Sequence, residues 1–347
     1  MMSAVGSTAA IRPGGGVDGL DAIMRRGGRA LRERMTRTEL HLERVTAQAG
    51  APLASHANAT IIAGGKRLRP LLVVLAAESA GGPPGNADGE ERLVRAAVAA
   101  ELVHSATLVH DDLIDGAQLR RGHRTVAAVA GRDVAIATGD LLFSRAFAEL
   151  ARNEDADQLC ALSDASSALA AGELLQREDA YASHVPVERY LRRCELKTAA
   201  LFEAACRLGA LAAIEASSVL ADALGVFARR IGLAFQMLDD VLDVSGPVER
   251  TGKTRGTDLL DGTVTLPLIL ARERDPALAA FDLATLADPQ EAEGLCERIA
   301  ATGALDEARE RALAVVAEAK AELPTILPDG RGELLDLVAD SVVERYR

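Results

Sequence analysis

Two short acidic clusters interrupt otherwise apolar, alanine-rich stretches of this chain. Each cluster places aspartates at positions i, i+1 and i+4. In a helix, positions i and i+4 lie on one face, so Asp111 and Asp115 form one acidic pair and Asp239 and Asp243 form another. Like charges at this spacing repel each other by about 0.2–0.5 kcal/mol even on an exposed helix. Folding alone gives no reason to repeat this arrangement, whereas binding of a cation does.

The composition favours an all-helical protein. Of the 347 residues, 49% are hydrophobic, but only 3% are aromatic and tryptophan is absent, while alanine is abundant. Alanine, leucine, glutamate and arginine all have high helix propensity. We expect residues 1–17, which contain a Pro-Gly-Gly-Gly run, to form a disordered N-terminal tail. Residues 18–347 are expected to form a single all-α domain, since we find no break in composition within them.

Charge and hydropathy exclude several classes of protein. The formal net charge of −12 argues against a nucleic-acid binder and against a polybasic membrane anchor. We find neither a secretory signal nor an apolar run of spanning length, so stable membrane insertion is not expected. The four cysteines form no CxxC pair and are expected to be reduced, which favours a cytoplasmic protein.

The first acidic cluster ends a predicted helix over residues 91–114 whose C-terminal part is largely apolar. At 100° per residue, His104, Asp111 and Asp115 fall within about 40° of one another around the helix axis. A polar stripe on an otherwise buried helix indicates that it faces a wet cavity. The second cluster ends another predicted helix, over residues 217–244.

The remaining segments predict further helices joined by polar loops. Further helical segments are expected from Thr265 to the end of the chain. A loop over residues 116–125 carries several basic side chains, and a polar loop over 245–258 follows the second cluster. The other predicted helices cover residues 18–48, 52–63, 71–79, 134–152, 155–182 and 187–211.

Additional motifs surround the two clusters in a fixed order along the chain. The ordered set is Gly64-Gly65-Lys66-Arg67-Leu68-Arg69-Pro70, His110-Asp111-Asp112-Leu113-Ile114-Asp115, Arg120-Arg121-Gly122, Lys197-Thr198, Gln236, Asp239-Asp240-Val241-Leu242-Asp243, Gly252-Lys253, Asp258-Leu259 and Thr265-Leu266-Pro267. With this set the chain resembles the trans-isoprenyl diphosphate synthases, also called polyprenyl synthetases. The resemblance covers residues 64 to 267, most of the chain.

The resemblance implies a fold and an activity. Members of this family form a single large helical bundle around a deep central cavity, the isoprenoid synthase fold, and usually assemble as homodimers. They are prenyltransferases that join isopentenyl diphosphate head to tail to an allylic diphosphate. The reaction depends on magnesium, and about three Mg²⁺ ions are expected to bridge the allylic diphosphate.

The resemblance also assigns roles to individual side chains. The expected metal ligands are Asp111, Asp115, Asp239 and Asp243, with Asp112 and Asp240 supporting them. The allylic diphosphate is expected to contact Arg120, Lys197, Thr198, Gln236 and Lys253, four of which (all but Arg120) are assigned to catalysis. Isopentenyl diphosphate is expected to contact Lys66, Arg69, His104 and Arg121. Arg67, His123 and Arg124 are expected to be ordinary surface residues, and no side chain is assigned as nucleophile or general base.

Product length in this family depends on what blocks the cavity beyond the first acidic cluster. Short-chain enzymes often carry aromatic residues four and five positions before the first aspartate, where this chain has Thr107 and Ala106. We therefore expect a medium- or long-chain all-trans product, most commonly used for the side chain of a quinone. Phe143 and Phe147 are equally consistent with a deeper floor of the cavity and with ordinary core.

Four alternatives remain open at this point. The chain could be a shorter-chain synthase that makes geranylgeranyl or farnesyl diphosphate. A class I terpene cyclase would not need the second diphosphate site. Glu101-x-x-His104 on a buried helix is also found in ferritin-like di-metal proteins, although such proteins need a second copy of this motif, which we do not find. A non-catalytic subunit of a heteromeric synthase would typically have lost one acidic cluster.

Overall fold

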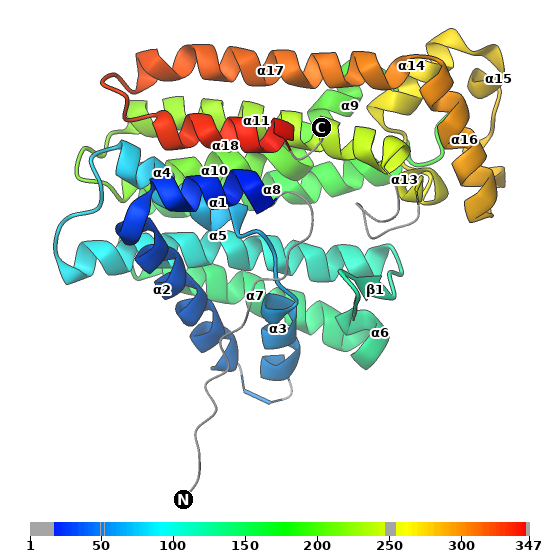
Figure 1. Ribbon diagram of the computed structural model, residues 1–347. Coiled ribbons are helices and arrows are strands. Elements are labelled where there is room, and N and C mark those ends of the chain that lie inside the picture. The colour runs from blue at the N-terminus through cyan, green and yellow to red at the C-terminus, as the bar shows by residue number, and fades with distance from the viewer. Residues whose placement is uncertain (1–16, 49, 52, 247–254, 345–347) are drawn as a thin grey trace, which may run out of the picture.

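The computed structural model describes residues 17–48, 50–51, 53–246 and 255–344, and these residues are helical almost throughout (Figure 1). The helices of the N-terminal half are α1 (Val17–Arg26), α2 (Gly28–Ala47), α3 (Leu53–Ile62), α4 (Leu68–Ser79), α5 (Ala87–Ile114), α6 (Val126–Ala130), α7 (Arg132–Ala151) and α8 (Ala156–Asp179). Those of the C-terminal half are α9 (Val187–Cys194), α10 (Ala200–Leu211), α11 (Ser218–Ser245), α13 (Thr257–Leu260), α14 (Leu266–Arg274), α15 (Pro276–Ala279), α16 (Pro289–Ala301), α17 (Ala304–Ile326) and α18 (Glu333–Glu344). A π-helical turn, η1 (Glu195–Ala199), joins α9 to α10, and a 3₁₀ turn, η2 (Leu283–Thr285), follows α15.

Local sequence explains where the helices begin and break. The helix predicted over residues 18–48 is two helices, because Gly28 adopts a left-handed conformation with φ of 70° and turns the chain. The long helices α5, α8 and α11 each begin with a side-chain cap. The caps are Asn86, Asp155 and Ser217, and each accepts a hydrogen bond from the backbone N–H three residues later.

The basic loop after α5 contains a small hairpin that we did not predict. Strands β1 (Leu119–Arg120) and β2 (His123–Arg124) pair antiparallel, with Arg120 opposite His123. The two residues at the tip, Arg121 and Gly122, have φ of 53° and 80°. Positive φ at both positions is what a two-residue type I′ turn requires, and it fixes where the Arg121 side chain leaves the loop.

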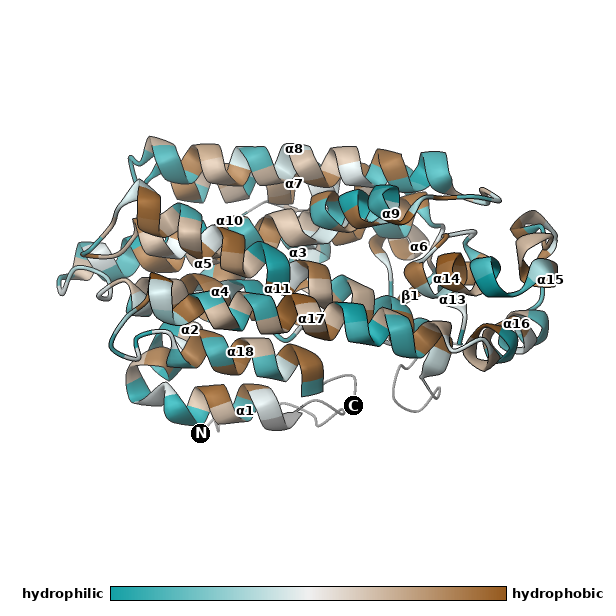
Figure 2. Ribbon diagram, turned by 90° about the horizontal axis from the view of Figure 1, so that it is seen from above, coloured by the Kyte–Doolittle hydropathy of each residue, from teal (hydrophilic) through white to brown (hydrophobic). Residues whose placement is uncertain are grey.

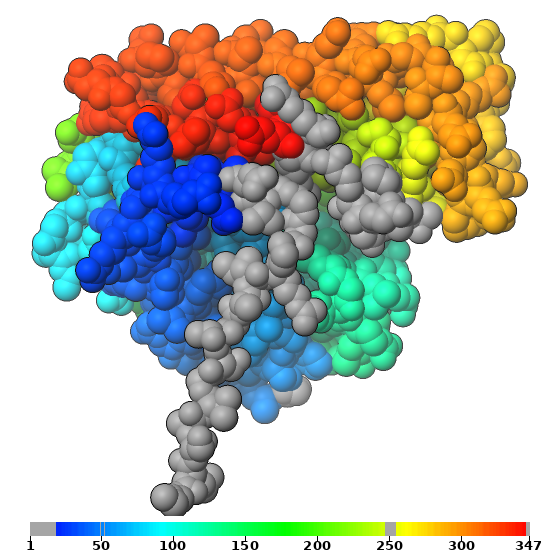
Figure 3. Space-filling view, in the orientation of Figure 1, coloured from blue at the N-terminus to red at the C-terminus, as the bar shows by residue number. Residues whose placement is uncertain are grey.

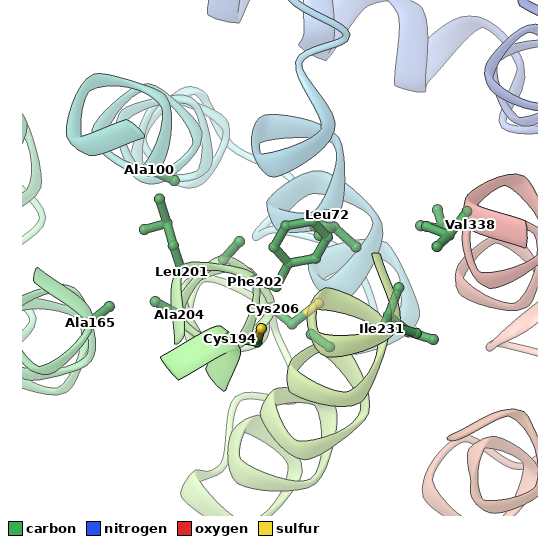
Figure 4. Packing of buried hydrophobic residues seen from close by; sticks show 14 of the residues in the cluster. Leu72, Ala100, Ala165, Cys194, Leu201, Phe202, Ala204, Cys206, Ile231 and Val338 are labelled. Atoms are coloured by element: carbon green, nitrogen blue, oxygen red, sulfur yellow. The ribbon is translucent and has the colours of Figure 1, made fainter. Parts of the chain in front are cut away.

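The core of the bundle centres on α10, which contacts α4, α5, α8 and α11. In Figure 4, the Leu201 side chain on α10 points toward Ala100 on α5, and the ring of Phe202 lies beside Leu72 on α4. These side chains are almost completely buried. Burying each large apolar side chain contributes roughly 1.5–3 kcal/mol. These central helices therefore pack into one frame, of which α5 and α11 are part.

The outer helices cover this frame. Seen from above, α7 and α8 lie at one edge of the bundle and α1 at the other, and hydrophobic and polar residues alternate around most helices (Figure 2). Near the two ends of the described chain, α1 packs against α18, and the blue and red surfaces adjoin in the space-filling view (Figure 3). One hydrophobic core includes residues from Ile23 to Val342.

The N-terminal tail and membrane insertion were two further subjects of the sequence analysis. The predicted tail, residues 1–17, lies outside the described residues except for Val17, the first residue of α1. Within the described ranges, no helix combines the length and the apolar character needed to cross a membrane.

The close approach of α4 and α10 depends on Gly209. A Cβ atom there would lie 2.0 Å from the backbone oxygen of Val73, which cannot move independently of α4. We expect Gly209→Ala to lower the free energy of unfolding by about 2–4 kcal/mol because the two helices must separate. Gly294→Ala on α16 is the matched control. A Cβ atom at Gly294 would meet no described residue within 4 Å, so this substitution should stabilise the fold by up to about 1 kcal/mol. Urea denaturation of both variants checks this, and an unaltered midpoint for Gly209→Ala would contradict it.

Candidate active site

The first acidic cluster lies at the C-terminal end of α5, and its three aspartates have different surroundings. Asp112 is buried and accepts a hydrogen bond from Arg120 Nε at 2.7 Å. Asp115 caps the end of α5 and forms an ion pair with Arg177 of α8. Asp111 is half-buried. Burial raises the pKa of Asp111 to about 6, although the charge of Lys197 acts in the opposite direction.

The second cluster lies at the C-terminal end of α11. Asp240 is buried and accepts hydrogen bonds from Tyr190 Oη and Gln236 Nε2, both at 2.7 Å. Burial, followed by the charge of Asp258, raises the pKa of Asp240 to about 7. Asp239 and Asp243 are half-buried instead. In both clusters, therefore, the middle aspartate is buried and bonded to the protein, while the predicted metal ligands keep accessible surface.

The π-helical turn η1 connects the two clusters. Lys197 lies close enough to Asp111 for its positive charge to oppose the rise in the pKa of Asp111. The neighbouring Thr198 donates a hydrogen bond to Gln236 Oε1 at 2.7 Å. The sequence predicted a regular helix here, over residues 187–211. The wider turn occurs where η1 packs tightly on α8, since a Cβ on Gly172 would lie 2.5 Å from the backbone nitrogen of Lys197. Single π-helical turns of this kind are frequent at functional sites.

Sequence reasoning missed two residues that pair with the predicted site. Glu173 on α8 accepts hydrogen bonds from Lys197 and, at 2.9 Å, from Arg177 Nε. Arg177 in turn pairs with Asp115, so one chain of charges runs from Lys197 to the first acidic cluster. The only sequence signal was a Glu and an Arg four residues apart, which is common on solvated helix faces.

A separate group of cations lies between the start of α4 and the hairpin. Arg69 is half-buried, its guanidinium carbon lies 5.2 Å from the centre of the Phe202 ring, and its buried Nε has no hydrogen-bond partner among the described residues. The hairpin brings the Arg121 guanidinium close to Gly65, just before Lys66 in the chain. A Cβ atom added to Gly65 would lie only 2.9 Å from Arg121 Nη1. Lys66 extends from the exposed loop between α3 and α4.

His104 lies beside these cations on α5. Burial, together with the charges of Arg69 and Arg121, holds the pKa of His104 well below its ordinary value, so the ring is neutral near pH 7. Burial also lowers the pKa of Arg69 to about 10, a value at which the guanidinium still carries its charge at pH 7. The structure thus brings Arg69, His104 and Arg121 together as a positive cluster with one neutral donor.

The other basic side chains named in the sequence analysis have different outcomes. Arg67 was expected to be an ordinary surface residue, and that was wrong: only 11% of its side chain is exposed, and it pairs with Glu39 and Glu101. His123 and Arg124 are exposed, as predicted. Lys253 lies outside the described residues.

Of the two positions predicted to control product length, Ala106 is packed in the core. It has no exposed surface, and neither do Ala100 and Val103, which precede it on α5. Thr107, by contrast, is half-buried and lies one turn before Asp111 on the same face of α5. Phe143 stacks on His110 with ring centres 6.0 Å apart, at the contact between α5 and α7. A long ligand could pass Ala106 only if neighbouring side chains move.

The carboxylates suit magnesium more than a metal that needs a complete protein cage. Among the described residues, no group of three His, Cys, Asp or Glu side chains is placed to hold a metal ion. Magnesium instead binds proteins through one or two carboxylates and takes its other oxygens from water and phosphate. Asp111, Asp239 and Asp243 are half-buried and so keep the accessible surface that such a partly hydrated ion needs. Asp115 pairs with Arg177 through one of its two carboxylate oxygens.

The chain is similar in sequence to known prenyl diphosphate synthases. Residues 51–301 match the family model described as polyprenyl synthetase. The chain is 41% identical over 253 residues to heptaprenyl diphosphate synthase component 2 from Geobacillus stearothermophilus, covering 72% of this chain and 76% of that protein. It is 37% identical over 290 residues to a geranylgeranyl diphosphate synthase from Methanosarcina mazei, covering 82% and 86%.

A solved structure gives the same result for the fold. The crystal structure of a polyprenyl synthase from Caulobacter crescentus, complexed with calcium and isoprenyl diphosphate, superimposes with a TM-score of 0.81. It is 33% identical, and the match covers 97% of this chain and all of that one. The predicted all-α isoprenoid synthase fold is therefore confirmed.

The raised pKa of Asp111 predicts how stability depends on pH. Because the pKa is about 6 in the folded chain and 3.8 ordinarily, the folded state binds more protons between these values, and ionisation destabilises it. With a chelator present, Asp111→Asn should raise the free energy of unfolding by about 1–2 kcal/mol at pH 8 and leave it unchanged near pH 4. Denaturation at both pH values checks this, with the exposed Asp164→Asn as control. An equal gain at both pH values would contradict the assignment.

Proposed function

The chain belongs to the polyprenyl synthetase family, and on that premise we propose that it condenses isopentenyl diphosphate head to tail with an allylic diphosphate in a magnesium-dependent reaction. Its enzyme class, a trans-prenyltransferase, is that of the family. The proposed product is a medium- or long-chain all-trans polyprenyl diphosphate. The observation that carries the proposal is the pair of aspartate clusters joined through the Lys197–Thr198 turn.

The allylic diphosphate is proposed to bind between the ends of α5 and α11. Asp111, Asp115, Asp239 and Asp243 would hold about three Mg²⁺ ions, which would supply Lewis-acid stabilisation to the departing diphosphate. Buried Asp112 and Asp240 orient the groups around these carboxylates through the hydrogen bonds they accept. The calcium in the Caulobacter crescentus structure supports a divalent cation in this family.

Cationic and polar side chains complete this first site. Arg120 is held beside the first cluster by Asp112, and Lys197 is held by Glu173. Both can donate to diphosphate oxygens, and Thr198 and Gln236 lie next to them. Stabilising negative charge as it develops on the leaving group is the main contribution that such a site makes to catalysis. Lys253 is proposed to join them.

Isopentenyl diphosphate is proposed to bind in the separate positive pocket formed by Lys66, Arg69, His104 and Arg121. The buried Nε of Arg69, which has no hydrogen-bond partner among the described residues, is the type of donor that a phosphate oxygen satisfies. His104 can donate a hydrogen bond without adding charge, because its pKa is held low. A terpene cyclase, which takes one diphosphate, would have no use for this pocket.

The full chain provides the direct test of this function. Purified protein with magnesium, isopentenyl diphosphate and allylic starters from dimethylallyl to geranylgeranyl diphosphate should yield a longer prenyl diphosphate. We propose that the chain acts as a cytoplasmic homodimer. Turnover by the purified chain alone would show that it needs no second component, although the name of the Geobacillus stearothermophilus relative, component 2, suggests one for that protein.

We expect Asp111→Ala to lower turnover by at least about 10³-fold, because a metal ligand is lost, while the helical circular dichroism is retained. Asp164→Ala on the exposed face of α8 is the control and should keep full turnover. Magnesium-dependent turnover by Asp111→Ala would rule out the proposed metal role.

Product length is a finer prediction, because relatives include both heptaprenyl and geranylgeranyl diphosphate synthases. Thr107→Phe places an aromatic ring on the accessible position one turn from Asp111. We expect this variant, and Ala106→Tyr, to shorten the product when it is sized by reversed-phase chromatography. Ala106 is fully buried, so its variant must first be shown to fold by thermal melting. Wild-type products from both folded variants would contradict the idea that this part of α5 limits elongation.

A further inference from the structure

Arg67 fastens the loop between α3 and α4 to three helices at once. Its Nε and Nη2 donate to the Glu39 carboxylate on α2 at 2.6 and 3.2 Å, and Nη2 also donates to the backbone oxygen of Ile61 on α3 at 2.8 Å. Nη1 donates to Glu101 Oε1 on α5 at 2.8 Å. A planar guanidinium with this many fixed acceptors has little freedom to move.

The backbone of Arg67 is constrained as well. Its φ of 48° is left-handed, an uncommon conformation for a residue with a long side chain, and Arg67 is the residue from which α4 begins. Lys66 comes immediately before it in the loop, and Arg69 comes two residues after it in the first turn of α4. Fixing Arg67 therefore fixes the direction in which both neighbouring cations leave the chain.

Glu101 is the deepest partner in this arrangement. Its side chain is 5% exposed, and it lies one helical turn before His104 on α5. Besides accepting the hydrogen bond from Arg67, its negative charge stabilises the charged form of Arg69. A buried ion pair contributes little net stability compared with a well-packed apolar pair, so a purely structural role leaves this one unexplained.

We propose that Arg67 and Glu101 form a positioning pair that holds Lys66, Arg69 and His104 in place to receive isopentenyl diphosphate, without touching it. This inference rests on the proposed function. It also accounts for the Glu101-x-x-His104 motif, which otherwise suggests a di-metal protein: the glutamate holds the arginine and the histidine lies in the pocket.

The sign of two substitutions separates positioning from simple electrostatics. If the pair acted only through its charges, Glu101→Gln would make the pocket more positive and lower the KM for isopentenyl diphosphate, whereas Arg67→Gln would raise it. If the pair positions the pocket, both substitutions release the same contact and both raise this KM. The double variant should then be no worse than the more severe single variant, because one interaction is lost in all three.

The experiment measures KM for both substrates, kcat and thermal melting for the wild type, Glu101→Gln, Arg67→Gln and the double variant. Glu91→Gln is the matched control, since it makes the same change on α5 in a part-buried ion pair with Arg95, about three turns away from Glu101 along the helix. We expect each single variant to raise the KM for isopentenyl diphosphate about 10-fold. The KM for the allylic diphosphate and kcat should stay within about 2-fold, and Glu91→Gln should behave as wild type.

Each other outcome contradicts the inference. A lower KM in Glu101→Gln indicates a charge effect alone. Unchanged KM values exclude any role in the pocket, and a rise in both KM values that parallels a loss of thermal stability indicates a structural role alone. Additive effects in the double variant mean that the two residues act independently. If the wild-type chain cannot condense the two diphosphates, the proposed function itself is contradicted. That outcome is distinct from the others, which all compare variants with an active wild type.

Discussion

Carboxylates brought together inside an apolar bundle are the constraint on which the rest of this structure depends. Each aspartate removed from water must gain a hydrogen bond, a nearby cation or a proton. Asp112 and Asp240 take the first solution, through Arg120 and through Tyr190 with Gln236. Asp115 takes the second, through Arg177. Burial raises the pKa of Asp111 to about 6, and it raises that of Asp240 to about 7 even with its two hydrogen bonds.

This uneven compensation has a functional consequence. Asp112 and Asp240 are buried and bonded to the protein and hold the geometry, whereas Asp111, Asp239 and Asp243 are only half-buried and keep accessible surface. The cations near α4 follow the same division. Arg67 is fixed by Glu39 and Glu101, and the buried Nε of Arg69 has no hydrogen-bond partner in the part of the chain that the structure describes. In both places the fixed residues position those that would meet a ligand.

The sequence was sufficient for the regular parts of this picture. Apolar periodicity and helix propensity predicted most of the long helices, including one that ends at the first acidic cluster. The spacing of the aspartates predicted that Asp111 and Asp115 share one helix face. What failed depends on tertiary contacts. The π-helical turn at Lys197 goes with close packing against Gly172, and the role of Arg67 depends on acceptors from three separate helices. Glu173 looked like any solvated glutamate until the fold placed it on Lys197.

Calorimetric titration of magnesium, with and without a non-ionisable allylic thiodiphosphate, tests the central claim most directly. Magnesium binds proteins through one or two carboxylates and completes its shell with water and phosphate, so it should bind weakly to the chain alone and strongly once the diphosphate contributes its oxygens. Asp111→Asn and Asp239→Asn should each abolish this cooperation. Tight magnesium binding without the diphosphate, or cooperation that survives both substitutions, would contradict the claim that the two clusters form one site around a shared ligand.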